Sequence, residues 1–338
     1  MNRLPLAVTL AVTLSLLATA CGREPPGHPD GGDAGSDAGR DAGQTTSDDG
    51  GGLSLANWNL EFFGDPNYDP ADDNLQQRNV TAVLADAGFD IAGLEEVVDV
   101  TRFSQVVAAL PGYDGVVSSD ATRVTGTNSC VSFSGSPCYG ASEQKLALIY
   151  RTQVATLRSA QLILTGDSTT ENDFAYRPPL RVDLDVKLAD GGTDPLVVIV
   201  LHLKAYTDAT SYQRRVASSA ELKTYLDNNL PTQKVAVVGD WNDDIDQSTA
   251  GGAVTPFKNF LDDPARYSFV TSVLTASNIG TQTFGSTIDH QLVTNELLPQ
   301  LHAGSVAVLH PETWGDPSLS AYTTTTSDHW PVCSRWDR

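Results

Sequence analysis

From Leu53 onward, short apolar runs alternate with polar segments, and this pattern constrains the fold more than any other feature. Runs that suit buried strands cover residues 53–59, 91–94, 145–150, 180–188, 196–203 and 234–238. Amphipathic patterns typical of helices cover residues 74–87, 101–110 and 211–230. On the last of these, the residues expected to face the core are Val216, Ala220, Leu222, Tyr225 and Leu226. Strands and helices alternate only in part, which predicts two packed sheets covered by helices in one domain, residues 53–338.

The charge of the chain limits what it can bind. It has 21 Lys+Arg and 42 Asp+Glu, a net charge of -21, and residues 53–338 alone carry -17. Tight binding of nucleic acid by counterion release needs clustered Lys and Arg, so this mode is disfavoured. Phosphate chemistry in such a chain would recruit its positive charge, most simply as a metal ion. A polytopic membrane protein is also excluded, because no apolar run beyond an N-terminal one reaches the ~20 residues of a membrane-spanning helix.

The first residues are typical of an export signal. One positive charge at Arg3 precedes an apolar stretch over residues 4–17 and the small residues Ala18-Thr19-Ala20. We expect residues 1–20 to be a signal peptide. Cys21 follows directly, as the lipidated Cys of a bacterial lipoprotein does, although an ordinary A-x-A cleavage site is the alternative. The expected location is therefore extracytoplasmic, either as an outer-membrane or cell-surface lipoprotein or as a secreted protein.

Export would also shape two further segments. Residues 21–52 are rich in Gly and Asp and cannot bury enough apolar surface to offset their chain entropy, so they are predicted to be a flexible tether. Cys130 and Cys138 flank a Ser/Gly/Pro-rich stretch that can double back. Disulfides persist outside the cytoplasm, so these two residues are predicted to form one, worth about 2 to 3 kcal/mol. Two unpaired loop thiols remain the alternative.

An acid, amide or His stands just after several apolar runs, where the predicted strands end. These residues are Asn59, Glu96, His202, Asp240, Asn242, Asp289, Asp328 and His329. Ligand sites gather where strands end in loops, because the scaffold is rigid there and side chains can converge. Each position alone is weak evidence, since an Asp after a strand is more often a turn former or a helix cap.

Five motifs occur in a fixed order: W-N at Trp58, L-x-E ending at Glu96, H-L at His202, G-D-x-N ending at Asn242, and S-D-H ending at His329. In combination they resemble the endonuclease/exonuclease/phosphatase superfamily, which includes deoxyribonuclease I, exonuclease III, neutral sphingomyelinases and inositol polyphosphate 5-phosphatases. The resemblance covers residues 53–338. It implies a four-layer α/β/β/α sandwich of two mixed sheets flanked by helices, with the active site at one end of the stacked sheets.

The resemblance also implies a metal site. Its residues would be Glu96, Asn59, Asp328 and Asp240. Oxygen ligands without Cys suit Mg²⁺, or Mn²⁺ or Ca²⁺, better than zinc. Glu96 is preferred over Glu95 because the motif places the ligand second, and alternation along a strand sends adjacent side chains to opposite faces.

Two His residues are implied to act in catalysis. His329 resembles the catalytic His, oriented by the carboxylate of Asp289, which would fix its tautomer and stabilise its cation. His329 would deprotonate the attacking water, with Asp240 as the alternative base. His202 resembles the second His of the deoxyribonuclease I branch, and Glu143 stands where its partner is expected.

Two more residues are implied to bind substrate. Asn242 resembles the amide that hydrogen-bonds the phosphate or the water, and Arg177 resembles an Arg that contacts substrate phosphate in the nucleases. For Arg177 and Glu143 a plain surface ion pair is the alternative.

The implied reaction is hydrolysis of a phosphodiester by in-line attack of water. His202 with Glu143, together with Arg177-Pro178-Pro179, favours an exported nuclease acting on DNA, with RNA as a second substrate. A sphingomyelinase-like phospholipase C or another phosphoesterase is the alternative, and a non-catalytic relative that binds a phosphate ligand is a second one. A phospholipase would normally show an exposed aromatic or aliphatic hairpin, and the sequence shows no convincing one. No protein partner is indicated, and Cys21 is the expected contact with a membrane.

Overall fold

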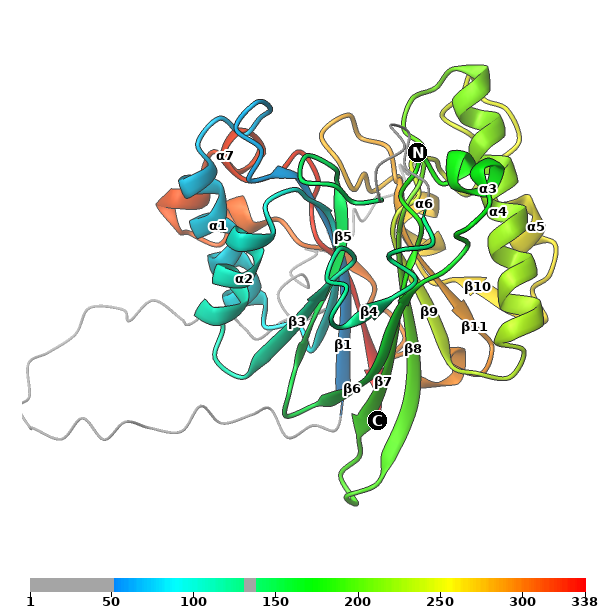
Figure 1. Cartoon of the computed structure of the whole chain (residues 1–338), viewed down its shortest axis with the longest axis horizontal. Helices are drawn as coiled ribbons and strands as arrows, with labels where there is room; N and C mark the ends of the chain where they lie inside the picture. The colour runs from blue at the N-terminus through cyan, green and yellow to red at the C-terminus, as the bar shows by residue number, and fades with distance from the viewer. Residues whose placement is uncertain (1–51, 131–137) are drawn as a thin grey trace, which may run out of the picture.

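Two mixed β-sheets pack face to face between two layers of helices (Figure 1). The computed structural model describes residues 52–130 and 138–338. Its architecture is the predicted four-layer α/β/β/α sandwich, so the fold class is confirmed. The predicted signal peptide, Cys21 and all of the tether except Gly52 lie outside the described residues and stay predictions.

The first sheet contains the amino-terminal and carboxy-terminal strands of the domain. Its order is β12 (Ala307–Val308), β13 (Val332–Asp337), β1 (Gly52–Phe63), β2 (Ile91–Val97), β5 (Lys145–Arg151) and β3 (Tyr113–Val117). Strands β1 and β2 run parallel, and the other neighbours are antiparallel. The carboxyl ends of β1 and β2 therefore lie at the same edge.

The second sheet repeats this arrangement with a different chain order. Its order is β10 (Tyr267–Phe269), β11 (Asp289–Thr294), β9 (Val235–Asp240), β8 (Thr193–His202), β7 (Leu180–Lys187), β6 (Ala155–Leu162) and β4 (Val124–Thr125). Strands β8 and β9 run parallel, whereas β11 is antiparallel to β9. The start of β11 therefore lies beside the ends of β8 and β9.

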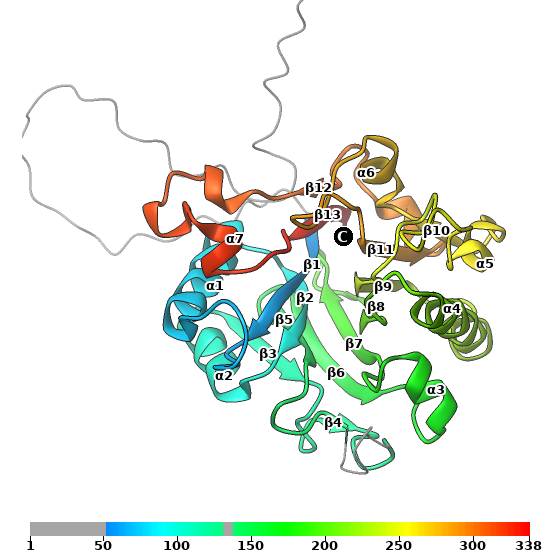
Figure 2. The same ribbon diagram turned by 90° about the horizontal axis from the view of Figure 1, so that it is seen from above.

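Helices cover the outer face of each sheet, as the view from above shows (Figure 2). Beside the first sheet lie α1 (Asp73–Ala87), α2 (Val100–Ala109) and α7 (Tyr322–Thr325), and beside the second lie α3 (Ser168–Asp173), α4 (Ala209–Asn229) and α5 (Lys258–Leu261). Helix α6 (Ser272–Ala276) and the 3₁₀ helices η1 (Leu298–Gln300), η2 (Pro311–Thr313) and η3 (Pro317–Leu319) lie in connections. Asp72, Asp99 and Asp208 cap the longest helices by accepting backbone N–H groups of the first turn.

The central strands of each sheet are buried on both faces. Leu55, Leu148, Val198 and Val238 belong to the apolar core between the sheets. A second core lies between the first sheet and α1 and α2, and a third between the second sheet and α4 and α5. Burial on both sides explains why the strands read as continuous apolar runs in the sequence.

All six predicted strands and three predicted helices are present, but the predicted face of α4 was partly wrong. Leu222 and Leu226 are buried as expected, whereas Ala220 is exposed and Arg215 and Ser218 are buried in its place. The structure joins Cys130 and Cys138 in a disulfide, with Cα atoms 5.3 Å apart. Within residues 52–130 and 138–338, no helix is both long and apolar enough to cross a membrane.

Candidate active site

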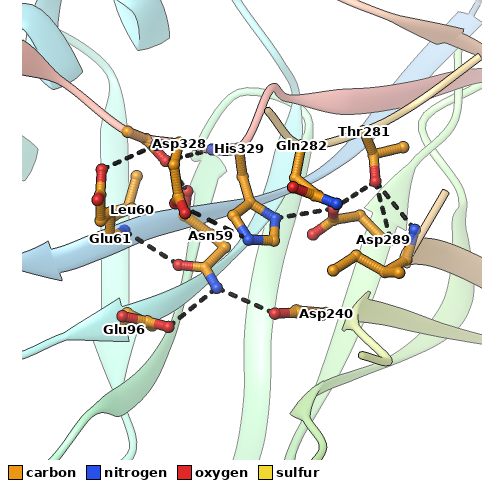
Figure 3. A network of polar contacts seen from close by, with 12 residues as sticks. Asn59, Leu60, Glu61, Glu96, Asp240, Thr281, Gln282, Asp289, Asp328 and His329 are labelled. Carbon is orange, nitrogen blue, oxygen red and sulfur yellow. Dashed lines mark hydrogen bonds and ion pairs between the residues drawn. The ribbon is translucent and has the colours of Figure 1, made fainter. Parts of the chain in front are cut away.

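The register of the second sheet aligns three polar residues in one row. Asp240 ends β9 and is paired with His202 of β8 on one side and with Asp289 of β11 on the other. Asp289 was expected to follow a strand but begins one, and it reaches the same edge because β11 is antiparallel to β9. Atoms of Asp240, Asp289 and His329 all lie within 4.8 Å of one another. The second sheet and the chain before β13 thus meet at one point, drawn in Figure 3.

The first sheet contributes Asn59 and Glu96 from the opposite side of this point. Nδ2 of Asn59 donates to Oε1 of Glu96 and to Oδ2 of Asp240, both at 3.1 Å (Figure 3). Oδ1 of Asn59 accepts the backbone N–H of Glu61 at 3.0 Å. Asn59 therefore holds the two carboxylates together across the sheets, and the second lone pair of its own oxygen remains available for the expected role at a metal.

A bulge rather than regular alternation positions Glu96. The β2–β5 register shifts between Leu94 and Val97, and Glu96 has a left-handed φ of 60°. Oε2 of Glu96 accepts the backbone N–H of Phe62 at 2.9 Å. Glu95 is fully buried as well, and neither of its carboxylate oxygens has a hydrogen-bond partner among the described residues. The argument from alternation for preferring Glu96 was therefore wrong, although Glu96 is the residue that contacts Asn59.

His329 and Asp289 form a buried pair. Nδ1 of His329 lies 2.9 Å from Oδ2 of Asp289, and the same oxygen accepts the hydroxyl of Thr281 at 2.6 Å. Burial alone would lower the pKa of His329, but Asp289, Asp240 and Asp328 together raise this pKa well above its usual value. These three carboxylates therefore favour the protonated form of the imidazole.

His202 faces the same two carboxylates but has the opposite charge preference. Its Nε2 lies 3.4 Å from Oδ2 of Asp240 and 3.7 Å from Oε1 of Glu96. Burial, followed by the positive charge of Arg177, lowers the pKa of His202 well below its usual value. Both effects favour the neutral form of the His202 imidazole.

Glu143 does not orient His202 in this structure. Nδ1 of His202 has no hydrogen-bond partner among the described residues. The neighbouring Gln144 instead accepts a hydrogen bond from Nη1 of Arg177. Arg177 also donates from Nε to the carbonyl of His202 at 3.2 Å and from Nη2 to that of Leu203 at 2.6 Å. The expected role of Glu143 as the partner of His202 was therefore wrong, and Arg177 supports the backbone behind the site.

Asn242 is bound to the loop around the site. Its backbone N–H donates to Oδ1 of Asp240 at 2.8 Å, and its Nδ2 donates to the carbonyl of Leu203 at 3.1 Å. Its φ of 55° is in the left-handed region, which Asn tolerates better than most residues. The second hydrogen on Nδ2 can still donate to a phosphate or a water.

Glu61 is a site residue that the sequence reasoning missed. Its Oε2 accepts the backbone N–H of Asp328 at 2.8 Å. Burial, followed by repulsion from Asp328, raises the pKa of Glu61 to about 7. Oδ1 of Asp328 lies 3.9 Å from Nε2 of His329, and its side chain is partly exposed. Regular alternation along β1 gave no signal for Glu61, because its φ of 51° is left-handed and the β1–β2 register shifts between Asn59 and Phe63.

Two Trp side chains fix the backbone that carries the His residues. Nε1 of Trp58 donates to the carbonyl of His329, and Nε1 of Trp241 donates to that of His290, both at 3.1 Å. His290 is buried, with Nε2 3.1 Å from the carbonyl of Asp243, so it packs beneath the site.

The donor set fits a divalent cation with oxygen ligands. Glu96 and Asp240 face one another across Asn59, and Glu61 and Asp328 stand at the rim. Burial raises the pKa of Glu96, and burial together with the charge of Asp289 raises that of Asp240 to about 7. A cation bound by Glu96, with Asp240, Glu61 and Asp328 near it, would offset this crowding of negative charge.

Comparisons with known proteins agree with this geometry. The family model for the Endonuclease/Exonuclease/phosphatase family matches residues 56–329. One similar solved structure is the human Nocturnin catalytic domain with bound sulfate anion, with 16% identity and a TM-score of 0.55, covering 85% of this chain and 94% of that one. A second is D. rerio TDP2 complexed with single strand DNA product, with 13% identity and a TM-score of 0.54, covering 85% of this chain and 99% of that one. A third is a Bacteroides thetaiotaomicron mannosyl-6-phosphatase, with 16% identity and a TM-score of 0.52, covering 83% of this chain and 98% of that one. A comparison with curated protein sequences finds no match.

At these identities the solved structures establish the fold alone, whereas the family model spans the site from β1 to His329. The chain belongs to the Endonuclease/Exonuclease/phosphatase family and is a phosphoesterase of that superfamily.

Proposed function

We propose that this protein is an extracytoplasmic, divalent-metal-dependent nuclease that hydrolyses phosphodiesters of DNA. The observation that carries the proposal is the convergence of Glu96, Asp240 and the His329–Asp289 pair at one end of the sandwich. The family generally uses a divalent metal, and the oxygen-rich donor set favours Mg²⁺ or a similar hard ion. One structurally similar protein, D. rerio TDP2, is described with a single strand DNA product.

The protonation states divide the chemical roles. Asp240, whose pKa is raised to about 7, can accept a proton from the attacking water as the oxygen–phosphorus bond forms. His329, whose pKa is raised, can donate its Nε2–H to a phosphoryl oxygen, while Asp289 holds the ring from Nδ1. This favours Asp240 over His329 as the base. A divalent ion held by Glu96, with Asp328 near it, would leave Asp240 to act as the base and would supply charge stabilisation for the phosphoryl and leaving oxygens.

His202 and Asn59 organise the carboxylates. The neutral His202 presents Nε2 to Asp240 and Glu96, and Asn59 donates to both. Each carboxylate is thereby held toward the point where the phosphate would lie, which is the pre-organisation that such chemistry needs.

A phospholipase of the same mechanism is the second candidate. Phe284 lies between α6 and β11 on the segment that also carries Thr281, and it is 89% exposed. An aromatic side chain this exposed beside the catalytic pair is the kind of feature that a lipid-acting enzyme presents to a membrane.

Assays on two substrates, run in parallel, distinguish the two candidate functions. The full chain is given supercoiled plasmid DNA and sphingomyelin vesicles, each with Mg²⁺ and with EDTA. The nuclease proposal expects DNA cleavage only with Mg²⁺ and no phosphocholine release. Lipid turnover with intact plasmid would overturn it in favour of the phospholipase.

The proposed location has its own test. Export of the chain, with a lipid on Cys21, is expected from residues 1–21 alone. Metabolic labelling with a palmitate analogue should mark the wild-type chain and not Cys21→Ser. A wild-type chain that appears in the culture medium without the label would support export and refute the lipid anchor on Cys21.

A further inference from the structure

Side chains that lie behind the loop after β8 hold it by donating hydrogen bonds to its backbone carbonyls. Nη1 of Arg215 donates to the carbonyls of Lys204 and Tyr206, at 2.7 and 2.8 Å. The carbonyl of Leu203 accepts from Arg177 and Asn242. The loop that continues directly from His202 is therefore fixed at successive positions.

Arg215 is itself anchored in the core. It is fully buried, and its Nε and Nη2 lie 3.0 and 2.9 Å from Oδ2 of Asp243, which is also fully buried. A buried ion pair with this many hydrogen bonds has a defined geometry and transmits it to the backbone it contacts.

Tyr206 is held in an unusual conformation by these contacts. Its φ is 80°, in the left-handed region that a bulky non-glycine residue rarely adopts. Its side chain is 73% exposed, so no burial of the ring compensates for the backbone strain. Strain that the surrounding structure enforces on an exposed aromatic residue next to an active site suggests a functional role.

Positive charge gathers at the same place in an acidic protein. Nζ of Lys204 lies 4.2 Å from the ring centroid of Tyr206, a cation–π contact. Among the described residues, no carboxylate lies within ion-pair distance of Lys204, Arg177 or Arg214. Burial, followed by the positive charges of Arg214 and Arg177, lowers the pKa of Lys204.

We propose that Lys204 and Tyr206 form a subsite for the nucleotide next to the scissile phosphodiester, with Lys204 binding its phosphate and Tyr206 stacking on its base. The proposal rests on the proposed nuclease function and adds to it. Stacking on an exposed aromatic ring beside a cation is a general mode of binding single-stranded nucleic acid, because every base has a π-face. It predicts a preference for unpaired substrate ends or single strands.

The test compares a substrate that reaches the subsite with one that does not. Full-length wild type, Tyr206→Ala, Tyr206→Phe and Lys204→Gln are assayed with Mg²⁺ on a single-stranded oligonucleotide and on bis(p-nitrophenyl) phosphate. Lys187→Gln is the charge control, since Lys187 is exposed at the far end of β7, where it pairs with Thr193. The measured quantity is the ratio of kcat/KM for the oligonucleotide to that for the small diester.

We expect Tyr206→Ala to lower this ratio about tenfold or more through KM, and Tyr206→Phe to restore most of it. Lys204→Gln should lower the ratio and flatten its dependence on salt. Lys187→Gln should match wild type.

An unchanged ratio in Tyr206→Ala and Lys204→Gln, with wild type active on both substrates, would overturn the subsite and leave the nuclease function intact. A wild type that cleaves neither DNA nor oligonucleotide would overturn the function and the subsite together. Loss of sphingomyelin-vesicle binding in Tyr206→Ala, with normal oligonucleotide kinetics, would assign the ring to a lipid surface instead.

Discussion

Oδ2 of Asp289 lies 2.9 Å from Nδ1 of His329, although 40 positions separate the two residues in the chain. One begins β11 and the other precedes β13, so the contact links the two sheets at their shared edge. Because Asp289 is buried and also accepts the hydroxyl of Thr281, the pair fixes which ring nitrogen of His329 faces the substrate.

The first prediction concerns this pair. His329→Ala and Asp289→Asn should each lower kcat by about 10² to 10⁴-fold, because the first removes the proton donor and the second removes the charge that keeps it protonated and oriented. Steady-state rates on DNA measure the loss, and circular dichroism checks the fold. His302→Ala is the matched control, since His302 is partly exposed beside Asp337 at the opposite end of β13. A folded Asp289→Asn with a normal rate would remove Asp289 from the mechanism.

The second prediction concerns pH. The pKa values of Glu61 and Asp240 are about 7 in the fold, above their ordinary values of 4.5 and 3.8. Between about pH 4 and 7 the folded metal-free protein thus binds more protons at these groups than the unfolded chain does, so their contribution to stability falls as pH rises. Mg²⁺ requires the deprotonated groups and should raise the melting temperature more at pH 8 than at pH 5.

Thermal unfolding with and without Mg²⁺ at both pH values measures this difference. Asp262→Asn is a suitable control, because Asp262 is an exposed acid paired with Lys258 on the surface. A Mg²⁺ effect of equal size at pH 5 and pH 8 would show that these carboxylates are not the ligands.

The third prediction concerns the buried ion pair behind the loop after β8. Arg215→Met leaves Asp243 buried without its cation and should lower the free energy of unfolding by about 3 to 5 kcal/mol. Asp227→Asn, which removes an acid paired with Lys223 and Arg266 near the surface, should cost about 1 kcal/mol or less. Urea unfolding of both variants distinguishes the two cases, and equal small losses would show that the Arg215–Asp243 pair does not stabilise the fold.

The sequence predicted the layers of the fold because most central strands are apolar on both faces. Strands β10 and β12 escaped prediction because they have only three and two residues, and β6 because its buried positions alternate with polar ones that face solvent. The inward face of α4 was misassigned because Arg215 is satisfied by Asp243 and by two carbonyls, an arrangement that depends on segments distant in sequence.

The sequence predicted most residues of the site but few of the contacts between them. The order of the motifs identified Glu96, Asp240 and His329. The spacing of residues along the chain could not predict the β-bulge that turns Glu96 toward Asn59. Glu61 was missed because its role depends on the backbone of Asp328, 267 positions away. Glu143 was assigned to His202 by position, whereas its neighbour Gln144 makes the contact to Arg177.

The most direct test of the central claim is the initial rate of plasmid nicking as Mg²⁺ is titrated, measured for the full chain and for Glu96→Gln. The site described here predicts no cleavage in EDTA, recovery on adding Mg²⁺, and for Glu96→Gln a rate about 10²-fold lower or more together with a higher Mg²⁺ requirement. Cleavage that persists in EDTA, or a Glu96→Gln variant with the wild-type rate and Mg²⁺ dependence, would contradict it.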